Sequence, residues 1–573
     1  MSRRPHVLTA AAVAAAGLTL GLTACGSGSS SSTSTPAGTT AGGTASTGTP
    51  AATGKSGGTV TALFGTAPDY LDPGEAYTTQ GAEPHWITYT GLYTYAHANG
   101  TAGTQVIPGL ADALPKISSD GKTYTMTLRK GLVFSDGTPV KAKDFTATIE
   151  RSIRLNWGGK SFFTGNIKGA DAFDKKQSKT ISGIKADDAT GKITITLKQP
   201  YGAFLNVLAF PAAGLVPSGT AVKNLSNDPP PGVGPYMIKD VVPNRSFTAV
   251  PNPQWAKMNI PGIPAAKVTV NVKIVSNTQL EAEQVINNSA DVFDNFDTLP
   301  PALLAQAKNQ ASDRFSQVPA VSTYYFFMNT QTKPFNNQMA RQAVDMAIDR
   351  RAISRLSSGT LQPGCFFLPP GMQGHPDGAC PSAGDPNAKP DLAKARALLK
   401  KSGEFGAKVT VWGQNRSPRK EYIDYYTSVL NQLGFKATTK LIADAAYFPT
   451  IGNLKSNPQT GFADWNQDFP NPSDFYLLLD QNSIQQTNNQ NFSQVKDPHI
   501  QSELAYLNKV PAADLEKAAP RWAALDKYVE QKAYFANYGY LVIPKFMSTK
   551  IDYKSAIVSP VYGNDWTSWS VGG

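Results

Sequence analysis

Three cysteines, at positions 25, 365 and 380, carry the thiol chemistry available to this 573-residue chain. Cys365 and Cys380 have fourteen residues between them, in a segment rich in Pro and Gly. In a chain that leaves the cytoplasm, two such cysteines most simply form a disulfide bond that restrains a long loop. A metal site is the alternative, but a zinc site needs about four ligands and only His375 lies nearby. The spacing therefore predicts a disulfide and leaves the metal site as the second interpretation.

Cys25 ends the pattern Leu22-Thr23-Ala24-Cys25, which follows an apolar run from Val7 to Leu22 and the basic pair Arg3-Arg4. A basic start, an apolar segment and small residues at its end are typical of an export signal. The run has sixteen residues, whereas a membrane span needs about 20. The pattern resembles the lipobox of bacterial lipoproteins, which implies a signal peptide over residues 1–24 and acylation of Cys25. An incidental thiol beside an ordinary cleavage site is the alternative, and Ser2-Arg3-Arg4 leaves twin-arginine export open.

The segment after Cys25 consists almost wholly of Gly, Ser, Thr, Ala and Pro as far as Gly58. Such a composition buries too little apolar surface to offset its own ordering entropy. We therefore expect residues 25–56 to form a flexible tether, which as a Gly/Ser-rich coil spans on the order of 30 Å. The folded part would then lie outside the cytoplasmic membrane, anchored to its outer face by lipid.

The histidines predict no recognisable catalytic site. The five, at positions 6, 85, 97, 375 and 499, form no His-Glu-x-x-His pair. After residue 58 the chain has neither a Gly-x-Ser-x-Gly elbow nor a Gly-x-x-x-x-Gly-Lys phosphate loop. We expect no enzymatic activity and no cofactor. A secreted hydrolase with scattered catalytic groups is the remote alternative.

Length and composition limit the remaining classes. About 515 residues follow the tether, too many for one core, so two or three domains are expected. The apolar content of 41% is that of a globular protein, and no later run is long enough for a membrane span. The formal charge of +11 is modest for this size, and no Lys/Arg-rich run marks a nucleic-acid surface. We expect no nucleic-acid partner.

Hydrophobic periodicity predicts a mixed α/β chain, rich in strands early and in helices late. A strand is expected at 58–64, and alternation with period two marks strands at 124–128, 193–197 and 268–274. Helical patterns follow at 278–288 and 422–433, with a strand around 409–411. Asn337 is positioned to cap a helix that runs through Ile348, and Pro390 to open one that ends at Gly403.

A set of motifs in order along the chain resembles the extracellular solute-binding proteins of family 5, the peptide-binding components of ABC importers. The motifs are Ile107–Asp112, Ser119–Tyr124, Leu128–Pro139, Pro231–Tyr236, Met328–Thr330 and Arg341–Arg350. They span essentially the whole chain after the tether. A lipoprotein signal is a further feature that the family has in bacteria without a periplasm, which implies the cell surface of a Gram-positive-type bacterium.

The resemblance implies an α/β, two-lobed periplasmic-binding-protein-like fold of the large peptide-binding class (type II), with an extra domain in the first lobe. Lobe 1 would comprise a core domain from residues 57–98, 225–318 and 545–573, together with an additional domain from 99–224. Lobe 2, the ligand-binding domain, would run from 319 to 544. The lobes would close on the ligand about hinges near 318–329 and 538–546.

The resemblance also implies a binding edge around Trp465 and Asp468. In family members that bind peptides, the matching Asp meets the ligand's α-ammonium, and backbone groups that match Asp464 and Asn466 pair with the peptide as an added strand. A single carboxylate aimed at an ammonium group in a closed cleft both orients and selects the ligand. The alternative for Asp468 is to cap the turn before Pro470.

Three aromatic residues, Trp465, Tyr324 and Tyr325, are candidate walls of the site or members of the core. Relatives often carry an acidic residue where this chain has Asn471, which leaves the ligand class open. We expect a monomer that captures a di- or oligopeptide, or another small solute, and delivers it to the permease and ATPase subunits of an ABC importer. A signalling or adhesion lipoprotein with the same fold is the alternative.

Overall fold

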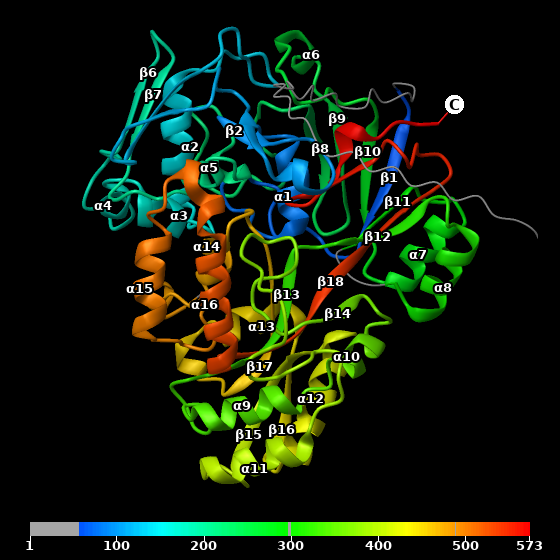
Figure 1. Cartoon of the computed structure of the whole chain (residues 1–573). Helices are drawn as coiled ribbons and strands as arrows, with labels where there is room; N and C mark the ends of the chain where they lie inside the picture. The colour runs from blue at the N-terminus through cyan, green and yellow to red at the C-terminus, as the bar shows by residue number, and fades with distance from the viewer. Residues whose placement is uncertain (1–56, 296–298, 488, 573) are drawn as a thin grey trace, which may run out of the picture. The chain divides into compact units, whose positions relative to one another are not determined.

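The structure is a computed structural model that describes residues 57–295, 299–487 and 489–572. Its described part contains one large sheet that continues through both halves of the molecule (Figure 1). In spatial order its strands are β16 (Lys436–Ile442), β15 (Lys408–Gln414), β17 (Thr460–Asn466), β13 (Ser322–Met328), β18 (Phe535–Met547), β11 (Val292–Asp294), β1 (Thr59–Phe64), β10 (Thr269–Ile274), β9 (Ser246–Pro251) and β8 (Tyr236–Val242). Two further strands, β12 (Phe315–Pro319) and β14 (Leu361–Pro363), pair with β18 beside this path.

The long strand β18 connects the two halves of the sheet. Its beginning pairs with β13 from Phe535 to Gly539 and with β14 from Gly539 to Leu541. Its end pairs with β12 from Val542 to Phe546 and with β11 at Phe546 and Met547. One continuous strand therefore contributes hydrogen bonds to both halves.

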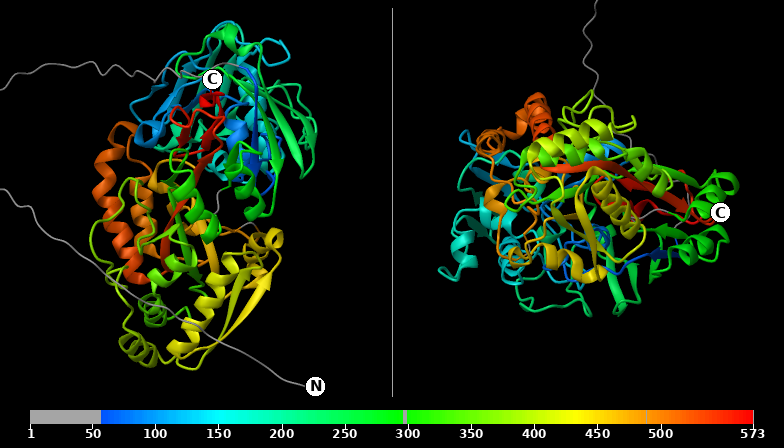
Figure 2. Two further views of the ribbon diagram at one scale, coloured as in Figure 1. Left: turned by 90° about the vertical axis from the view of Figure 1, so that its right-hand side faces the viewer. Right: turned by 90° about the horizontal axis from the view of Figure 1, so that it is seen from below.

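Smaller sheets lie outside this large one. An antiparallel sheet has the order β4 (Lys116–Ile117), β5 (Thr123–Thr127), β7 (Lys192–Thr196), β6 (Ile184–Asp187). Two ribbons are formed by β2 (Tyr93–Tyr95) with β3 (Val106–Pro108) and by β19 (Ile557–Ser559) with β20 (Gly563–Asp565). The last ribbon packs beside the earliest helix, so the C-terminal segment lies among N-terminal elements (Figure 2).

The helices cover the sheets on several sides. They are α1 (Thr79–Trp86), α2 (Ala142–Arg154), α3 (Ser161–Asn166), α4 (Ala170–Asp174), α5 (Phe204–Val207), α6 (Trp255–Met258), α7 (Thr278–Ile286), α8 (Pro301–Gln310), α9 (Gln338–Ala347), α10 (Arg350–Leu356), α11 (Leu392–Ser402), α12 (Arg419–Leu433), α13 (Asp444–Ile451), α14 (Pro472–Tyr476), α15 (Pro498–Leu507) and α16 (Ala519–Lys532). None of these helices combines the length and the apolar character that crossing a bilayer requires, within the residues described.

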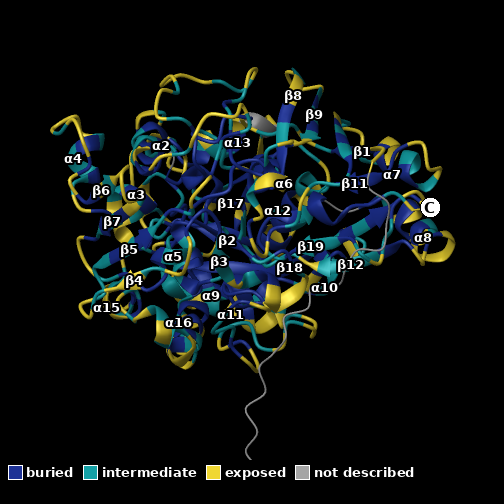
Figure 3. Cartoon of the chain, turned by 90° about the horizontal axis from the view of Figure 1, so that it is seen from above, coloured by how far each residue is buried: buried dark blue, intermediate teal, exposed yellow. Residues whose placement is uncertain are grey.

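The buried side chains form two large cores. The first core joins residues from Val60 to Val292 with residues from Met547 to Trp569, and the second core extends from Tyr324 to Leu541. Phe469 is the exception, because it follows a strand of the second core but packs in the first. A smaller cluster under α7 and α8 adjoins the first core through Leu63 and Phe546. Figure 3 shows buried residues concentrated in the strands and exposed residues in the outer loops and helices.

The predicted strands are confirmed where the residue pattern alternates. In β5 and β7 the buried positions are Tyr124, Met126, Ile193 and Ile195, so these strands bury one face. In β10, Val270 and Val272 are buried in the same way. The alternation of apolar and polar residues in the sequence therefore identified these strands correctly.

Two helix boundaries differ from the prediction. Helix α9 is capped by Asn337 as expected but ends at Ala347, because Ile348 is extended and Asp349 caps the next helix, α10, by accepting from the Ala352 N–H at 3.0 Å. Helix α11 begins at Leu392 because the Asp391 carboxylate, and not Pro390, provides the N-cap. The first N–H groups of a helix have no partner within the helix, and the Asp391 carboxylate can accept a hydrogen bond from one of them, whereas the proline side chain has no acceptor.

Candidate functional site

The predicted binding edge is the outer edge of β17. This strand pairs with β13 along its whole length, whereas its ladder with β15 includes only Thr460 and Gly461. The backbone C=O of Gln459 accepts from Asn329, and the backbone N–H of Gln467 donates to Val321. The backbone N–H and C=O groups of odd-numbered residues in β17 therefore point toward β13, and those of even-numbered residues point away from it. The C=O of Phe462, which accepts from the Tyr447 hydroxyl, follows this alternation. The backbone groups of Asp464 and Asn466 therefore point to the edge beyond the β15 ladder.

Asp468 lies two residues past the end of β17 and faces the first core. Its Oδ2 accepts a hydrogen bond from the hydroxyl of Tyr77 at 2.5 Å, although the two residues are 391 positions apart. Tyr77 is therefore a site residue from the other half of the molecule, and it was not predicted. Burial raises the pKa of Asp468 to about 7, against the opposing effect of the Tyr77 hydrogen bond.

A second carboxylate, Asp474, supports the loop that carries Asp468. Its Oδ2 accepts from the Asp468 N–H at 2.7 Å, and its Oδ1 accepts from Nε1 of Trp465 at 3.3 Å. Burial, followed by the nearby Asp468 charge, raises the pKa of Asp474 well above its usual range. The two carboxyl groups make this end of the edge attractive to a cation.

The turn after Asp468 is capped by other residues. The Asn471 side chain accepts from the Ser473 N–H at 3.0 Å and caps α14, while Asp474 accepts from the backbone of Asp468. The hydrogen bond to the Asp468 carboxylate comes from Tyr77 instead. The hydrogen bonds of the described turn thus come from Asn471 and Asp474, and the Asp468 side chain faces Tyr77.

Asp464 forms an ion pair that the sequence did not predict. Its Oδ2 lies 2.9 Å from an Nη of Arg419, and this guanidinium also bonds Gln414 and lies over the ring of Phe462. Arg419 begins α12, three residues before the helix that the sequence predicted at 422–433. The ion pair holds the Asp464 side chain in place while the backbone of Asp464 stays at the edge.

The aromatic candidates divide into two groups. Tyr324 and Tyr325 are buried in the second core, where Tyr325 packs against Phe367 and Phe535. They occupy the core position that was the alternative interpretation. Trp465 lies on β17 and is half-buried, and its Nε1 donates to Asp474, the residue that supports the Asp468 loop.

Phe469 extends the same loop into the first core. Its ring is fully buried and meets the rings of Phe162 and Phe210 edge-on, with centroids 5.5 and 5.9 Å apart. Nearby, the Gln467 amide donates to the carbonyl of Pro560 at 2.5 Å. The loop from 467 to 469 is thus one of the places where the second half of the molecule contacts the first.

Two cavities adjoin this loop. A small cavity of about 40 Å³ lies beside Asp468 and Tyr77. A larger one, of about 940 Å³, is lined by residues of both halves, including Asn466 and Gln467. It also lies against the crossing strands β12 and β18, and we call it the hinge-side cavity. Its volume lies within the range of small-molecule sites, about 300–1,000 Å³.

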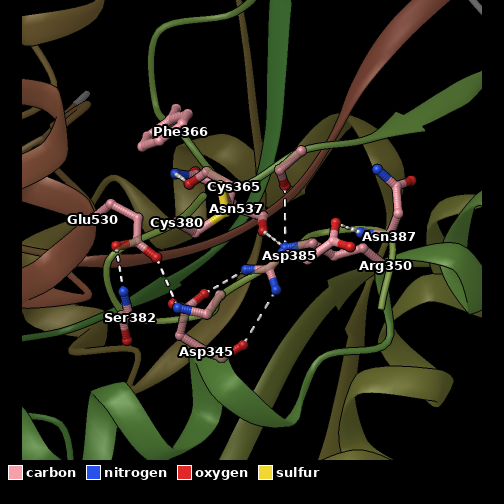
Figure 4. The surroundings of a disulfide bond; sticks show 12 residues. Asp345, Arg350, Cys365, Phe366, Cys380, Ser382, Asp385, Asn387, Glu530 and Asn537 are labelled. Carbon is pink, nitrogen blue, oxygen red and sulfur yellow. Dashed lines mark hydrogen bonds and ion pairs between the residues drawn. A yellow bond between two sulfur atoms is a disulfide. The ribbon is translucent and has the colours of Figure 1, made fainter. Parts of the chain in front are cut away.

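Cys365 and Cys380 are joined in a disulfide bond, the pairing that the sequence favoured (Figure 4). The Glu530 carboxylate lies close to both sulfur atoms, but its oxygens accept from the N–H groups of Ser382 and Ala383 at 2.7 and 2.9 Å. His375 Nδ1 lies 2.6 Å from the carbonyl oxygen of Leu368. The cysteines thus serve to restrain a loop. Cys25, the signal peptide and the tether lie outside the described residues.

Comparison with known proteins agrees with this architecture. The family model described as bacterial extracellular solute-binding proteins, family 5 Middle, matches residues 105–487. The glutathione-binding protein GsiB of Salmonella choleraesuis is 30% identical over 332 residues, which cover 56% of this chain and 58% of that protein. The chain thus matches little more than half the length of these curated relatives.

Solved structures match over nearly the whole chain. Clavulanic acid biosynthesis oligopeptide binding protein 2 aligns with a TM-score of 0.82 and 22% identity, covering 91% of this chain and 96% of that one. The murein tripeptide binding protein MppA of Escherichia coli aligns with a TM-score of 0.74 and 21% identity, covering 90% and 98%. The predicted fold, an α/β two-lobed periplasmic-binding-protein-like fold, is confirmed. Because the family model spans most of the described residues, this chain belongs to the bacterial extracellular solute-binding proteins of family 5.

Proposed function

We propose that the protein captures short peptides with a free amino terminus in the cleft between its two lobes. The observation that carries the proposal is the placement of Asp468 at the end of the outward-facing edge of β17, opposite Tyr77 of the other lobe. A peptide added to that edge would bond the backbone of Asp464 and Asn466, and its ammonium group would meet Asp468. Relatives described as tripeptide- and oligopeptide-binding support this ligand class.

The electrostatics of the loop suit an ammonium group. Asp468 and Asp474 are two carboxyl groups in a buried environment whose pKa values burial raises. An ammonium partner favours the ionised form of Asp468, and a hydrogen bond between charged groups is about twice as strong as a neutral one. Tyr77 would hold the carboxylate in position from the other lobe.

The division into lobes in this proposal follows the two cores. Residues 57–98, 225–318 and 545–573, with the additional domain 99–224, would move as lobe 1, and residues 319–544 as lobe 2. The chain crosses between the cores at β12 to β13 and along β18, which supports hinges near 318–329 and 538–546. In this proposal Phe469 enters lobe 1 as the lobes close.

The test is calorimetry with one peptide in two forms, carrying a free or an acetylated amino terminus. The free form should bind and the acetylated form should not. A thermal shift of the free form should accompany binding, because ligand at ~100 times Kd adds ~2.7 kcal/mol to stability. Mass analysis of the recovered peptide should find it intact, whereas cleavage would favour the hydrolase alternative. Equal binding of both forms would overturn the proposal.

Affinity for the free peptide should fall as the pH is lowered through about 7. The raised pKa means that Asp468 is protonated below about 7 in the ligand-free protein, so binding an ammonium must first displace that proton. Each pH unit below this point then costs about tenfold in Kd, since one pKa unit equals 1.36 kcal/mol. The free energy of unfolding of the ligand-free protein should change in the opposite direction to the affinity. A raised carboxyl pKa stabilises the fold at low pH, and this contribution is lost as the pH rises through about 7. Calorimetry at pH 5.5, 6.5 and 7.5 measures the binding trend, and a flat profile would contradict it.

The same proposal includes a lipid anchor on Cys25 and delivery of the peptide to an ABC importer at the outer face of the cytoplasmic membrane. The protein would act as a monomer with no enzymatic activity, and partner subunits would be the permease and the ATPase. The lipobox pattern Leu22–Cys25 supports the anchor.

Replacing Cys25 by Ser should leave the protein unlipidated and block cleavage of the signal. In detergent phase separation the wild type should enter the detergent phase and Cys25→Ser the aqueous phase, because stable anchoring needs two acyl chains. Cys365→Ser is the matched control, since Cys365 lies in the folded part, paired with Cys380, and its replacement should not change partitioning. A Cys25→Ser protein that is processed and partitions like the wild type would refute the anchor.

A further inference from the structure

The lining of the hinge-side cavity carries a single charged side chain among the described residues, that of Glu516. Apolar side chains come from both lobes: Met372 and Leu515 from lobe 2, Val558 and Pro560 from lobe 1, Ile543 from β18 and Val321 from the link between β12 and β13. The Glu516 side chain is exposed. The cavity therefore offers buried apolar contact and no cationic partner.

This cavity lies next to the surroundings of Asp468. The small cavity beside Asp468 and the hinge-side cavity share Thr79, Gln467 and Val561 as lining residues. Gln467 lies next to Asp468 in the chain, and Asn466, whose backbone faces the outer edge of β17, lines the larger cavity. The hinge-side cavity is thus the larger cavity next to a ligand amine placed at Asp468.

One wall of the cavity is held in place covalently. Pro370, Gly371, Met372 and Gln373 line the cavity and belong to the loop closed by the Cys365–Cys380 disulfide. The same loop is fixed at its far end by Glu530, which accepts from Ser382 and Ala383. A wall restrained in this way loses little entropy when a ligand binds, so contact with it contributes fully to affinity.

We propose that the hinge-side cavity holds an uncharged, apolar side chain of the bound peptide, so that the protein selects peptides with a residue such as Leu or Phe close to the amino terminus. This inference rests on the proposed function, because it places the peptide's ammonium group at Asp468. An acidic side chain would be rejected, since it would lose its hydration, find no cation and meet Glu516.

The expected preference is large enough to measure. Burying a Leu or Phe side chain that would otherwise stay exposed should tighten Kd by roughly 10- to 100-fold relative to Ala. A Glu at the same position should bind more weakly than Ala. A Lys should gain little from Glu516, because a charge pair at an exposed site is worth little.

The experiment is calorimetry with Ala-Ala-Ala and with tripeptides in which one residue at a time is changed to Leu, Phe or Glu. At one position at least, Leu and Phe should bind 10- to 100-fold more tightly than Ala, and Glu more weakly. Two cavity-filling variants, Val558→Phe in lobe 1 and Leu515→Trp in lobe 2, should each remove most of the Leu and Phe preference. The quantity compared in each variant is the ratio of the Kd for Ala-Ala-Ala to the Kd for the Leu or Phe peptide, so a change that affects all three peptides equally does not count as a loss of preference.

Val222→Phe is the matched control for Val558→Phe, because Val222 is 51% exposed in a loop that does not line the cavity. It should keep the full preference. A single cooperative thermal unfolding transition, as in the wild type, shows that the cavity variants are folded, and using one variant in each lobe guards against a local folding defect. Free-amine peptides that bind with no gain from Leu or Phe, or a gain that survives both cavity variants, would overturn this inference alone. Failure of every free-amine tripeptide to bind would overturn the proposed function and this inference together.

Discussion

Asp468→Asn is expected to weaken binding of a peptide with a free amino terminus by roughly 30- to several-thousand-fold. Truncating one partner of a desolvated charge pair costs ~2–5 kcal/mol, and each 1.4 kcal/mol is a factor of ten in Kd. Asn keeps the size of the side chain and can still accept from Tyr77, so the loss reports the missing charge. Calorimetry with the free and the acetylated peptide measures it.

The variant should also lose most of the wild type's preference for the free amine, and its affinity should no longer follow the titration of residue 468. Asp424→Asn is the matched control, because Asp424 is an exposed carboxylate of lobe 2 that pairs with Lys420 on α12. It should leave both affinities unchanged. If Asp468→Asn and the wild type discriminate equally between the two peptides, Asp468 does not contact the amino group.

Arg350→Met should lower the free energy of unfolding by ~3–5 kcal/mol, the usual cost of leaving one member of a buried ion pair without its partner. The Arg350 guanidinium lies 2.5 Å from Asp345, and both side chains are at most 3% exposed. Its Nε also donates to the carbonyls of Gly364 and Asn537, the latter on β18 (Figure 4). Methionine fills similar space but supplies neither charge nor donors.

The loss of stability should be larger at pH 8 than at pH 5. Burial raises the pKa of Asp345, and the Arg350 charge opposes that shift. Burial and then the Asp345 charge also raise the pKa of Glu530, to about 8. Without Arg350, the Asp345 pKa rises further, and a raised carboxyl pKa stabilises the fold only at pH values below it. Urea unfolding at both pH values measures the difference.

Arg355→Met provides the matched control on the same helix. The Arg355 side chain is 68% exposed and lies 4.0 Å from Asp349, so this pair should contribute no more than about 1 kcal/mol at either pH. Equal losses from the two substitutions would mean that the Arg350 network contributes no more than a surface ion pair does.

The sequence predicted those parts of the site that lie in one continuous stretch. Trp465 and Asp468 belong to a motif of a few residues, and the alternation of β17 then fixes which backbone groups face outward. Tyr77 could not be found in the same way, because its contact with Asp468 depends on how the lobes meet and not on any local pattern. Arg419 was missed for a related reason: the predicted helix began only at residue 422, and a helical pattern does not show which carboxylate a residue at the start of a helix reaches.

The roles of Tyr324 and Tyr325 could not be predicted from the sequence because of how their strand is buried. Tyr324 and Tyr325 are neighbours in a strand that is buried on both faces, so period-two alternation is absent and hydrophobic patterning cannot separate a cavity wall from a core position. The strands that bury one face only, such as β5 and β7, were identified correctly because their pattern differs between faces.

The position of β18 in the chain has a consequence for biosynthesis. Both halves of the large sheet need this strand, yet its residues, 535–547, follow nearly all others in the sequence. During synthesis neither half can complete its central pairing until β18 has emerged, and pairing over such long sequence separations is slow. The folding of both halves therefore cannot finish before the synthesis of β18 does.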